Sequence, residues 1–178
     1  MAHNEKQRSD TSTKIKAEKM IQNTIVDKLA RTIERVELGK GGAVKLPFIY
    51  ADLDVQNVRL DNVQPPFAAA TPIESAVVVS ERGRYQEQAT FEVFFGDMMA
   101  HPMSDYCALE NERIIDACKQ RAFQWLASLV GNKELQLVSV NSMQHVVLQF
   151  DSVATGVLVS VTLKEIKAYG ICDLGTIR

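Results

Sequence analysis

Residues 85–95, which read YQEQATFEVFF, are the stretch from which we predict the fold. Apolar residues occupy most of the alternate positions, and they are Tyr85, Ala89, Phe91, Val93 and Phe95. The positions between them are mostly polar, which is typical of a β-strand with one buried face and one face in water. The stretch is about twice the usual strand length, so we expect it to be the long central strand of an antiparallel sheet. Residues 157–164 repeat the pattern, with Ser160 and Thr162 among the outward positions.

Shorter strands are predicted on both sides of this long one. The other predicted strands span residues 46–51, 55–60, 75–81, 135–140, 144–150 and 157–164. We expect strand 75–81 to pair directly with strand 85–95 through a hairpin turn at residues 81–84. Short turns join the last three strands, one of them at Asn141 and Ser142, so these strands are expected to form an antiparallel meander.

Two long helices are predicted from apolar residues that recur at three- and four-residue steps. The first spans residues 14–37, with a hydroxyl residue within 11–13 as its cap, and the second spans residues 105–130, capped by Asp105. The apolar stripe of the second helix consists of Ile114, Ile115, Cys118, Ala122, Trp125, Leu126 and Leu129. Gly131 is expected to close this helix, because glycine accepts the left-handed conformation that follows a helix end.

The order of these elements predicts an α+β fold, in which a central, mostly antiparallel sheet packs against two long helices. Along the chain the predicted order is α-β-β-β-β-α-β-β-β. Residues 14–172 are expected to form a single domain. The polar residues 1–13 and 173–178 are expected to be a disordered N-terminal arm and a C-terminal tail, since they have few apolar side chains to bury.

A long loop is predicted at residues 61–72, between the early strands and the hairpin. This stretch contains Pro65, Pro66 and Pro72. Proline removes a backbone donor and fixes φ, so we expect an extended loop rather than a strand. A loop of this length in a compact domain is usually functional or disordered.

The composition is that of an ordinary globular protein, with 46% hydrophobic and 24% charged residues among 178. The formal net charge is −2, and this balance does not predict sequence-specific nucleic-acid binding or attraction to acidic membranes. The three cysteines have no C-x-x-C spacing, which indicates reduced thiols rather than a disulfide framework or a zinc site. No apolar run approaches the roughly 18 residues of a membrane span.

No catalytic or metal-binding motif is found in the sequence. The three histidines, His3, His101 and His145, lack H-E-x-x-H or any paired metal spacing. Methionines surround His101, and gap-filling or contact with a partner explains them better than a soft-metal site. Cys107 and Cys118 lie on or beside an apolar helix stripe, where packing is the usual role of a thiol. We therefore expect neither an enzyme nor a bound cofactor.

The predicted order of elements resembles that of the tail-terminator (tail-completion) proteins of long-tailed bacteriophages. The resemblance covers about residues 14–164 and rests on residues 46–50, FEVFFGDMM at 91–99, ERIIDACKQRAFQWL at 112–126 and TGVLVSVTLKE at 155–165. In that family a hexameric ring caps the tail tube and joins it to the head connector, and there are no catalytic residues to carry over. The arm before Lys14 and the proline-rich loop depart from the family's pattern.

The resemblance implies a structural virion protein of the tail or neck, assembled in the cytoplasm of a bacterial host. Its partners would be further copies of itself in a homo-hexamer, the tail tube protein and a neck or connector protein. We expect contacts with these partners at Pro65, Pro66, Arg82, Arg84, Phe94, Met98 and Met99. Phe94 is included because it falls on the polar side of strand 85–95, where an exposed phenylalanine indicates a contact surface.

Two other interpretations remain open. The first is a monomeric or dimeric domain that binds a small ligand or a peptide between its sheet and its second helix. The pocket would then be lined by Phe91, Phe94, Phe95, Met98, Met99 and Trp125. The second is a neighbouring neck or head-completion protein. The native mass separates a monomeric binding domain from a ring.

Overall fold

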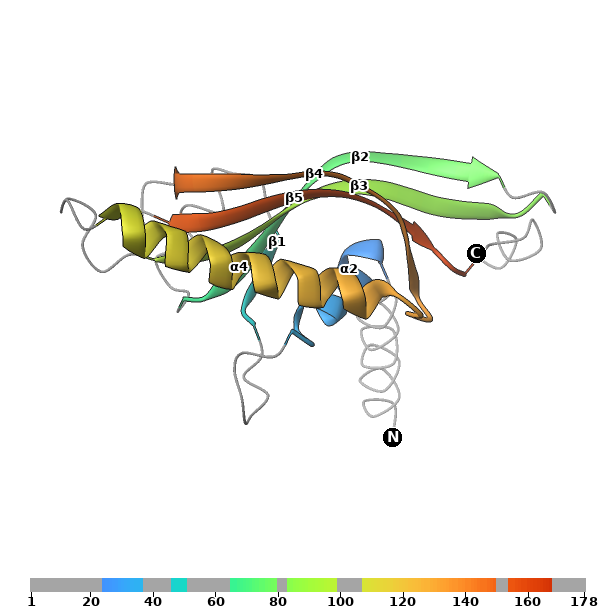
Figure 1. The fold of residues 1–178 in the computed structure, drawn as a ribbon. Coiled ribbons are helices and arrows are strands. Elements are labelled where there is room, and N and C mark those ends of the chain that lie inside the picture. Colours follow the sequence, from blue (N-terminus) through green and yellow to red (C-terminus); the bar gives the residue numbers. More distant parts are fainter. Residues whose placement is uncertain are drawn as a thin grey trace, which may run out of the picture.

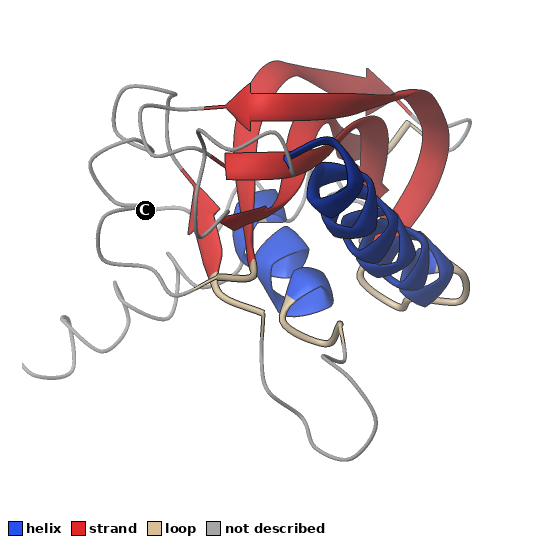
Figure 2. Ribbon diagram, turned by 60° about the vertical axis from the view of Figure 1, so that its left-hand side comes forward, coloured by secondary structure: helices blue, strands red, loops and turns tan. Residues whose placement is uncertain are grey.

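The computed structural model describes residues 24–36, 46–50, 65–79, 83–98, 107–149 and 154–167. Their elements are α2 (Ile25–Ile33), β1 (Phe48–Tyr50), β2 (Phe67–Val79), β3 (Tyr85–Met98), α4 (Cys107–Leu129), β4 (Leu135–Gln149) and β5 (Ala154–Glu165). Both helices lie on the same side of a strongly curved sheet (Figures 1 and 2). The α+β class and the mostly antiparallel sheet are confirmed. The predicted strand 55–60, the arm and the tail lie outside the described residues.

The sheet has five strands in the order β1-β2-β3-β5-β4 within the described part of the chain. β1 runs parallel to β2, and every other pair is antiparallel. β3 is therefore the central strand, as the long alternation of residues 85–95 predicted. β2 and β3 pair directly from Val79↔Tyr85 onward, which confirms the predicted hairpin.

Two predictions about strands are wrong. Phe67–Val79 is a single strand, although the prolines predicted a loop through residue 72. Pro72 is tolerated because β1 pairs only as far as Ala70 and because a register shift against β3 follows at Pro72. Residues 135–149 likewise form one strand, with a register shift near Asn141 in place of a turn, because β5 provides a continuous antiparallel partner.

The helix predicted over residues 14–37 is not continuous through Thr24. Thr24 has extended backbone angles, so a helix unbroken from residue 14 is excluded, and α2 begins at Ile25. The amide of Asp27 donates to Thr24 Oγ1 at 3.2 Å, and the amide of Thr24 donates to Asp27 Oδ2 at 3.0 Å. This reciprocal pair satisfies backbone donors at the helix start. α4 matches its predicted span closely, and Gly131 follows it with φ of 75°.

The core fills the space between the sheet and the two helices. Trp125 of α4 lies at its centre, with its ring centroid 5.5 Å from that of Phe95 and its Nε1 donating to Thr32 Oγ1 at 3.0 Å. The predicted apolar positions of α4 and β5 are buried or partly buried here. This packing holds β3 and β5 rigidly over α4 along the middle of the sheet.

The face of the sheet away from the helices is more buried than the alternation predicted. Ser160 and Thr162 of β5 do point away from the helices, but both are buried between side chains of the neighbouring strands β3 and β4. Thr162 Oγ1 lies 3.1 Å from Thr90 Oγ1, and it accepts a hydrogen bond from Asn141 Nδ2, also at 3.1 Å. These bonds replace the water that an exposed strand would have, so the central strands are fixed on both faces.

Candidate interaction surface

The paired ends of β2 and β3 project beyond both helices (Figure 1). We call residues 75–79 and 83–88 the hairpin end. In this region Val77 pairs with Glu87, and Val79 pairs with Tyr85. Paired residues of antiparallel strands lie on the same face, and alternate residues of one strand share a face. Val77 and Val79 therefore continue the face that Ala89 buries in the core, but at a point where no helix of the described residues covers it.

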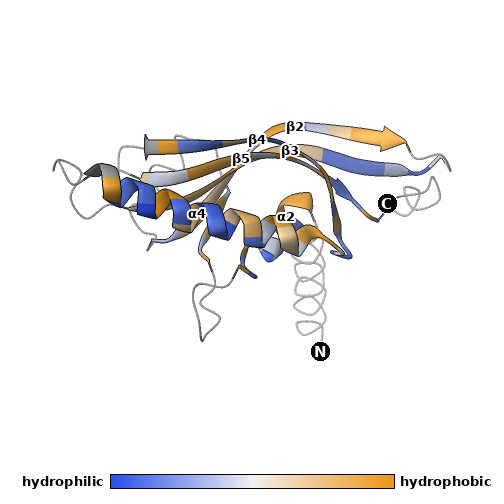
Figure 3. Cartoon of the chain, viewed as in Figure 1, coloured by the Kyte–Doolittle hydropathy of each residue, from blue (hydrophilic) through white to orange (hydrophobic). Residues whose placement is uncertain are grey.

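The hairpin end exposes large apolar side chains. Val77 is 67% exposed and Val79 is 60% exposed, and Tyr85 is exposed beside them. Figure 3 shows the end of β2 in the orange of apolar residues, against the hydrophilic start of β3. Adjacent exposed apolar side chains on a projecting element are typical of a surface that another molecule covers.

Within the described residues, the outer edge of β2 is also unpaired at the hairpin end. β1 pairs with β2 only over Ala68–Ala70, and beyond that point no strand of the described residues lies on this side. A straight strand edge with free backbone groups is a template for pairing with another chain. The opposite edge of the sheet, β4, is interrupted by three register shifts, and such irregularities oppose edge pairing.

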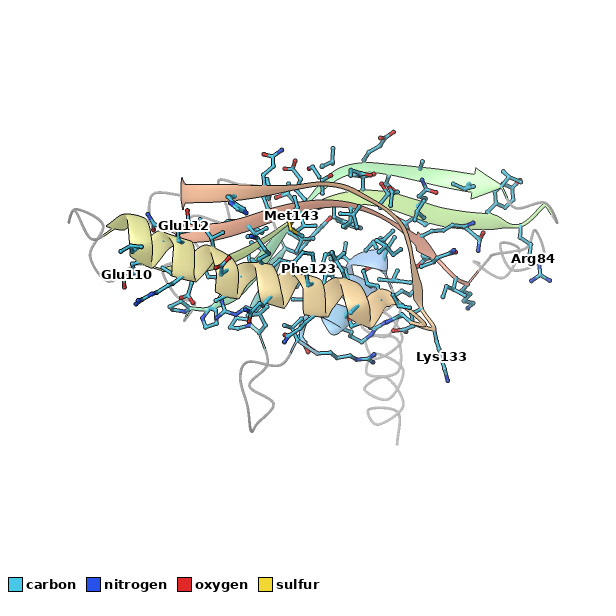
Figure 4. All side chains as sticks on the ribbon, viewed as in Figure 1. Arg84, Glu110, Glu112, Phe123, Lys133 and Met143 are labelled. Carbon is cyan, nitrogen blue, oxygen red and sulfur yellow. The ribbon has the colours of Figure 1, made fainter. Side chains whose placement is uncertain are left out.

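The predicted contact residues that the structure describes do not lie on one surface. Arg84 is exposed at the tip of the hairpin (Figure 4), whereas Pro65 is exposed at the opposite end of β2. The 13 residues of β2 span roughly 40 Å, so these two positions cannot share one contact. Pro66 is partly buried next to Pro65, and Met98 ends β3. Arg82 and Met99 lie outside the described residues.

Phe94 is not the exposed contact residue that its position predicted. It does lie on the face away from the helices, but it is only 3% exposed. Its ring centroid is 5.9 Å from that of Phe67, and both belong to a second, smaller apolar cluster. Gly96 makes room for this pair, because a Cβ at that position would collide with the Phe94 ring. Phe94 is buried because residues 67–72, predicted as a loop, form part of β2 and place Phe67 beside it.

The sequence interpretation missed the exposed face of the hairpin end, although one signal was present. Glu87 falls on the apolar side of the two-residue period of 85–95 and breaks the pattern there. A charged residue at a core-facing position indicates that the strand has already left the core. Glu87 instead accepts a hydrogen bond from Ser75 Oγ at 3.2 Å on the surface.

Of the side chains proposed to line a ligand pocket, the described ones are packed in the apolar clusters of the protein. Phe91, Phe95 and Trp125 are completely or almost completely buried in the core. One pocket of about 340 Å³ lies elsewhere, at the end of α4, and it is lined by Arg35, Ser128, Val130, Gly131, Asn132, Lys133 and Glu134. It is open and polar, and the two cations beside it lie at the negative end of the α4 dipole, where they are stabilised without a ligand.

The described residues contain no group of three or more histidines, cysteines or acidic residues that could hold a metal ion. None of the helices in the described ranges is long and apolar enough to cross a membrane. No family model matches the sequence, and no curated protein matches it.

Cys118 is expected to resist alkylation in the folded protein. Burial raises the pKa of its thiol to about 11, although the nearby Arg121 opposes this shift. At pH 8 the folded protein should show no reaction of Cys118 with iodoacetamide within an hour, while the unfolded protein should react fully, as measured by peptide mass spectrometry. Cys107 and Cys172 are replaced by serine so that only this thiol is followed.

The same shift predicts the direction of a pH effect. Below the unfolded pKa of the thiol the protonated Cys118 is present in both states, and its contribution to stability is complete. As the pH rises above that value toward 11, the unfolded state loses the proton first, so the free energy of unfolding falls. A Cys118→Ala variant should lack this decline, and rapid alkylation of native Cys118 at pH 8 would contradict the assignment.

Proposed function

We propose that this chain is a structural virion protein, a tail terminator whose ring caps a phage tail tube and joins it to the neck. The observation that carries the proposal is the hairpin end, which combines exposed apolar side chains with a strand edge that no described strand covers. A protein that functions alone gains nothing from such a surface and risks aggregation. A ring subunit needs it, because closed cyclic assembly requires an exposed patch on each copy for its neighbour.

The rigid core supports the same interpretation. The two central strands and α4 pack around Trp125, so the projecting hairpin end is held in a defined direction. A pre-organised element loses less conformational entropy when it docks than a flexible loop does. In this proposal the further partners are the tail tube protein and a neck or connector protein, in a virion that is assembled in the bacterial cytoplasm.

The proposal is tested by native mass spectrometry and negative-stain imaging of the purified full chain. We expect a closed ring of about six copies, as the family resemblance implies and as cyclic symmetry permits. Rings mixed with isolated phage tail tubes should be found at the tube ends. A chain that remains monomeric at about 100 µM would exclude the ring and would favour the binding-domain interpretation. Rings that ignore tail tubes would favour a neck or head-completion protein.

A further inference from the structure

A second exposed apolar surface lies on the opposite edge of the sheet, where α4 passes β4. Phe123 of α4 is 54% exposed, and Val140 of β4 is also exposed. Figure 4 shows Phe123 on the flank of α4 toward β4, beneath Met143, which is partly buried against the core. We call Phe123, Val140 and Met143 the outer strip.

Strand register explains why these side chains share a surface. Val140 pairs with Val161 and Met143 with Val159, and both partners belong to the core beneath α4. Paired residues of antiparallel strands lie on one face, so Val140 and Met143 point to the helix side of the sheet. β4 is an edge strand, so no further strand of the described residues covers them from outside.

Charged side chains flank both apolar surfaces. Glu112 and Asp116 are exposed on α4, and steps of about one and two helical turns lead from Glu112 to Asp116 and on to Phe123. These carboxylates therefore lie on the same flank as the outer strip. At the hairpin end, exposed Arg84 is adjacent to Tyr85 (Figure 4). Lys119 lies on the same flank and pairs with Asp116 at 3.6 Å. Glu87 lies on the same face of the hairpin end as Val77, so charges of both signs flank each apolar surface. In a contact between the two surfaces, Arg84 can face Glu112 while Glu87 faces Lys119.

We propose that the hairpin end of one copy docks on the outer strip of a second copy, with Val77, Val79 and Tyr85 against Phe123 and Val140. The contact rests on the proposed ring and names the two surfaces that build it. Arg84 then approaches Glu112, and Glu87 approaches Lys119. The two surfaces differ and lie on opposite edges of one sheet. Each copy therefore contacts one neighbour through its hairpin end and the other neighbour through its outer strip.

A second copy is the occupant that accounts for both surfaces at once. A contact between two unlike patches repeats from copy to copy, and it closes into a ring when the rotation between copies fits. A tip-to-tip contact between two hairpin ends would cover one surface and leave the outer strip of both copies exposed. The head-to-tail contact buries all of the large apolar side chains named here.

The first experiment disrupts each surface separately in the full chain. Val77→Lys and Phe123→Lys should each weaken self-association by about 30-fold or more in sedimentation velocity, since buried charge at an interface centre is strongly unfavourable. Val79→Lys and Val140→Lys repeat the test at a second position on each surface. The matched controls are Ala76→Lys, on the other face of β2, and Gln124→Lys, on the far flank of α4; both are exposed and should assemble normally.

The second experiment mixes the two defective variants. The Val77→Lys copy keeps an intact outer strip, and the Phe123→Lys copy keeps an intact hairpin end. Head-to-tail docking therefore predicts a dimer with one copy of each variant and nothing larger, identified by native mass spectrometry. Thermal unfolding of each variant should stay within a few degrees of the parent protein, because the altered side chains are exposed.

The possible outcomes separate this contact from the proposed function. If Val77→Lys abolishes assembly while Phe123→Lys and Val140→Lys do not, the hairpin end docks elsewhere and the inference is wrong. If all four variants still form rings that cap tail tubes, the ring uses other surfaces, and only the inference fails. A wild-type chain that never associates removes both the ring and the contact.

Discussion

Replacing Lys28 with alanine is expected to lower the free energy of unfolding by about 3–5 kcal/mol. Lys28 Nζ pairs with Glu165 Oε1 between α2 and the end of β5, across a sequence separation of 137 residues. The side chains are only 5% and 3% exposed, so the alanine variant leaves the carboxylate buried without its cation. Urea denaturation followed by far-UV circular dichroism measures the loss.

Two controls show whether burial of the unpaired charge is the cause. Arg31 lies on the same helix as Lys28, and Arg31→Ala removes its ion pair with Glu134. These two side chains are 38% and 41% exposed, so the expected loss of stability is about 1 kcal/mol or less. The double variant Lys28→Met, Glu165→Leu replaces the ion pair with apolar groups and should recover most of the stability. A Lys28→Ala variant as stable as the parent would show that Glu165 gains water or another partner.

Replacing Trp125 with alanine is expected to lower the free energy of unfolding by about 3–5 kcal/mol. The indole is completely buried, packs against Phe95 and donates its Nε1 hydrogen to Thr32 Oγ1. It therefore joins both helices to the central strand, and its removal leaves a large cavity. Because Trp125 is the only tryptophan, far-UV circular dichroism rather than fluorescence has to follow the unfolding.

Graded substitutions test this role of the indole. Trp125→Phe keeps an aromatic ring but loses the hydrogen bond to Thr32, so we expect an intermediate loss of about 1–2 kcal/mol. Phe123→Ala removes an exposed aromatic ring from the same helix and should change stability by less than about 0.5 kcal/mol. Equal losses for Trp125→Ala and Phe123→Ala would contradict the central position of Trp125 in the core.

The two variants with the largest expected losses also serve the assembly question. Both alter buried side chains that are not part of the exposed faces of the hairpin end and the outer strip, so any folded fraction should still associate. Lys28→Ala should lower the free energy of unfolding without weakening self-association of the folded protein. Phe123→Lys should weaken self-association without lowering the free energy of unfolding. This contrast identifies a true interface defect in the ring experiments.

Side-chain periodicity alone was sufficient for the α+β class, the central position of β3, the hairpin with β2 and the stripe of α4. These features follow from local periodicity. Val159, Val161 and Leu163, for example, form one apolar face of β5 that has to be buried in any arrangement of the strands. The local signal was misleading at Pro72 and at Asn141. Residues that usually form turns were placed within strands there, because long neighbouring strands continued past them.

The functional surfaces depended on facts that no local pattern contains. Val77 and Phe91 occupy the same face of one sheet, and both are apolar, yet one is exposed and the other is buried. The difference is that α2 and α4, the described helices, do not extend over the hairpin end (Figure 1). Conversely, Phe94 has a polar-side position but is buried, because Phe67 lies beside it on a strand that is distant in sequence. The spacing of apolar residues in the sequence determined which side chains share a face of a helix or strand. The tertiary structure decided which of those faces are buried, because burial depends on whether another element packs against that part of the face.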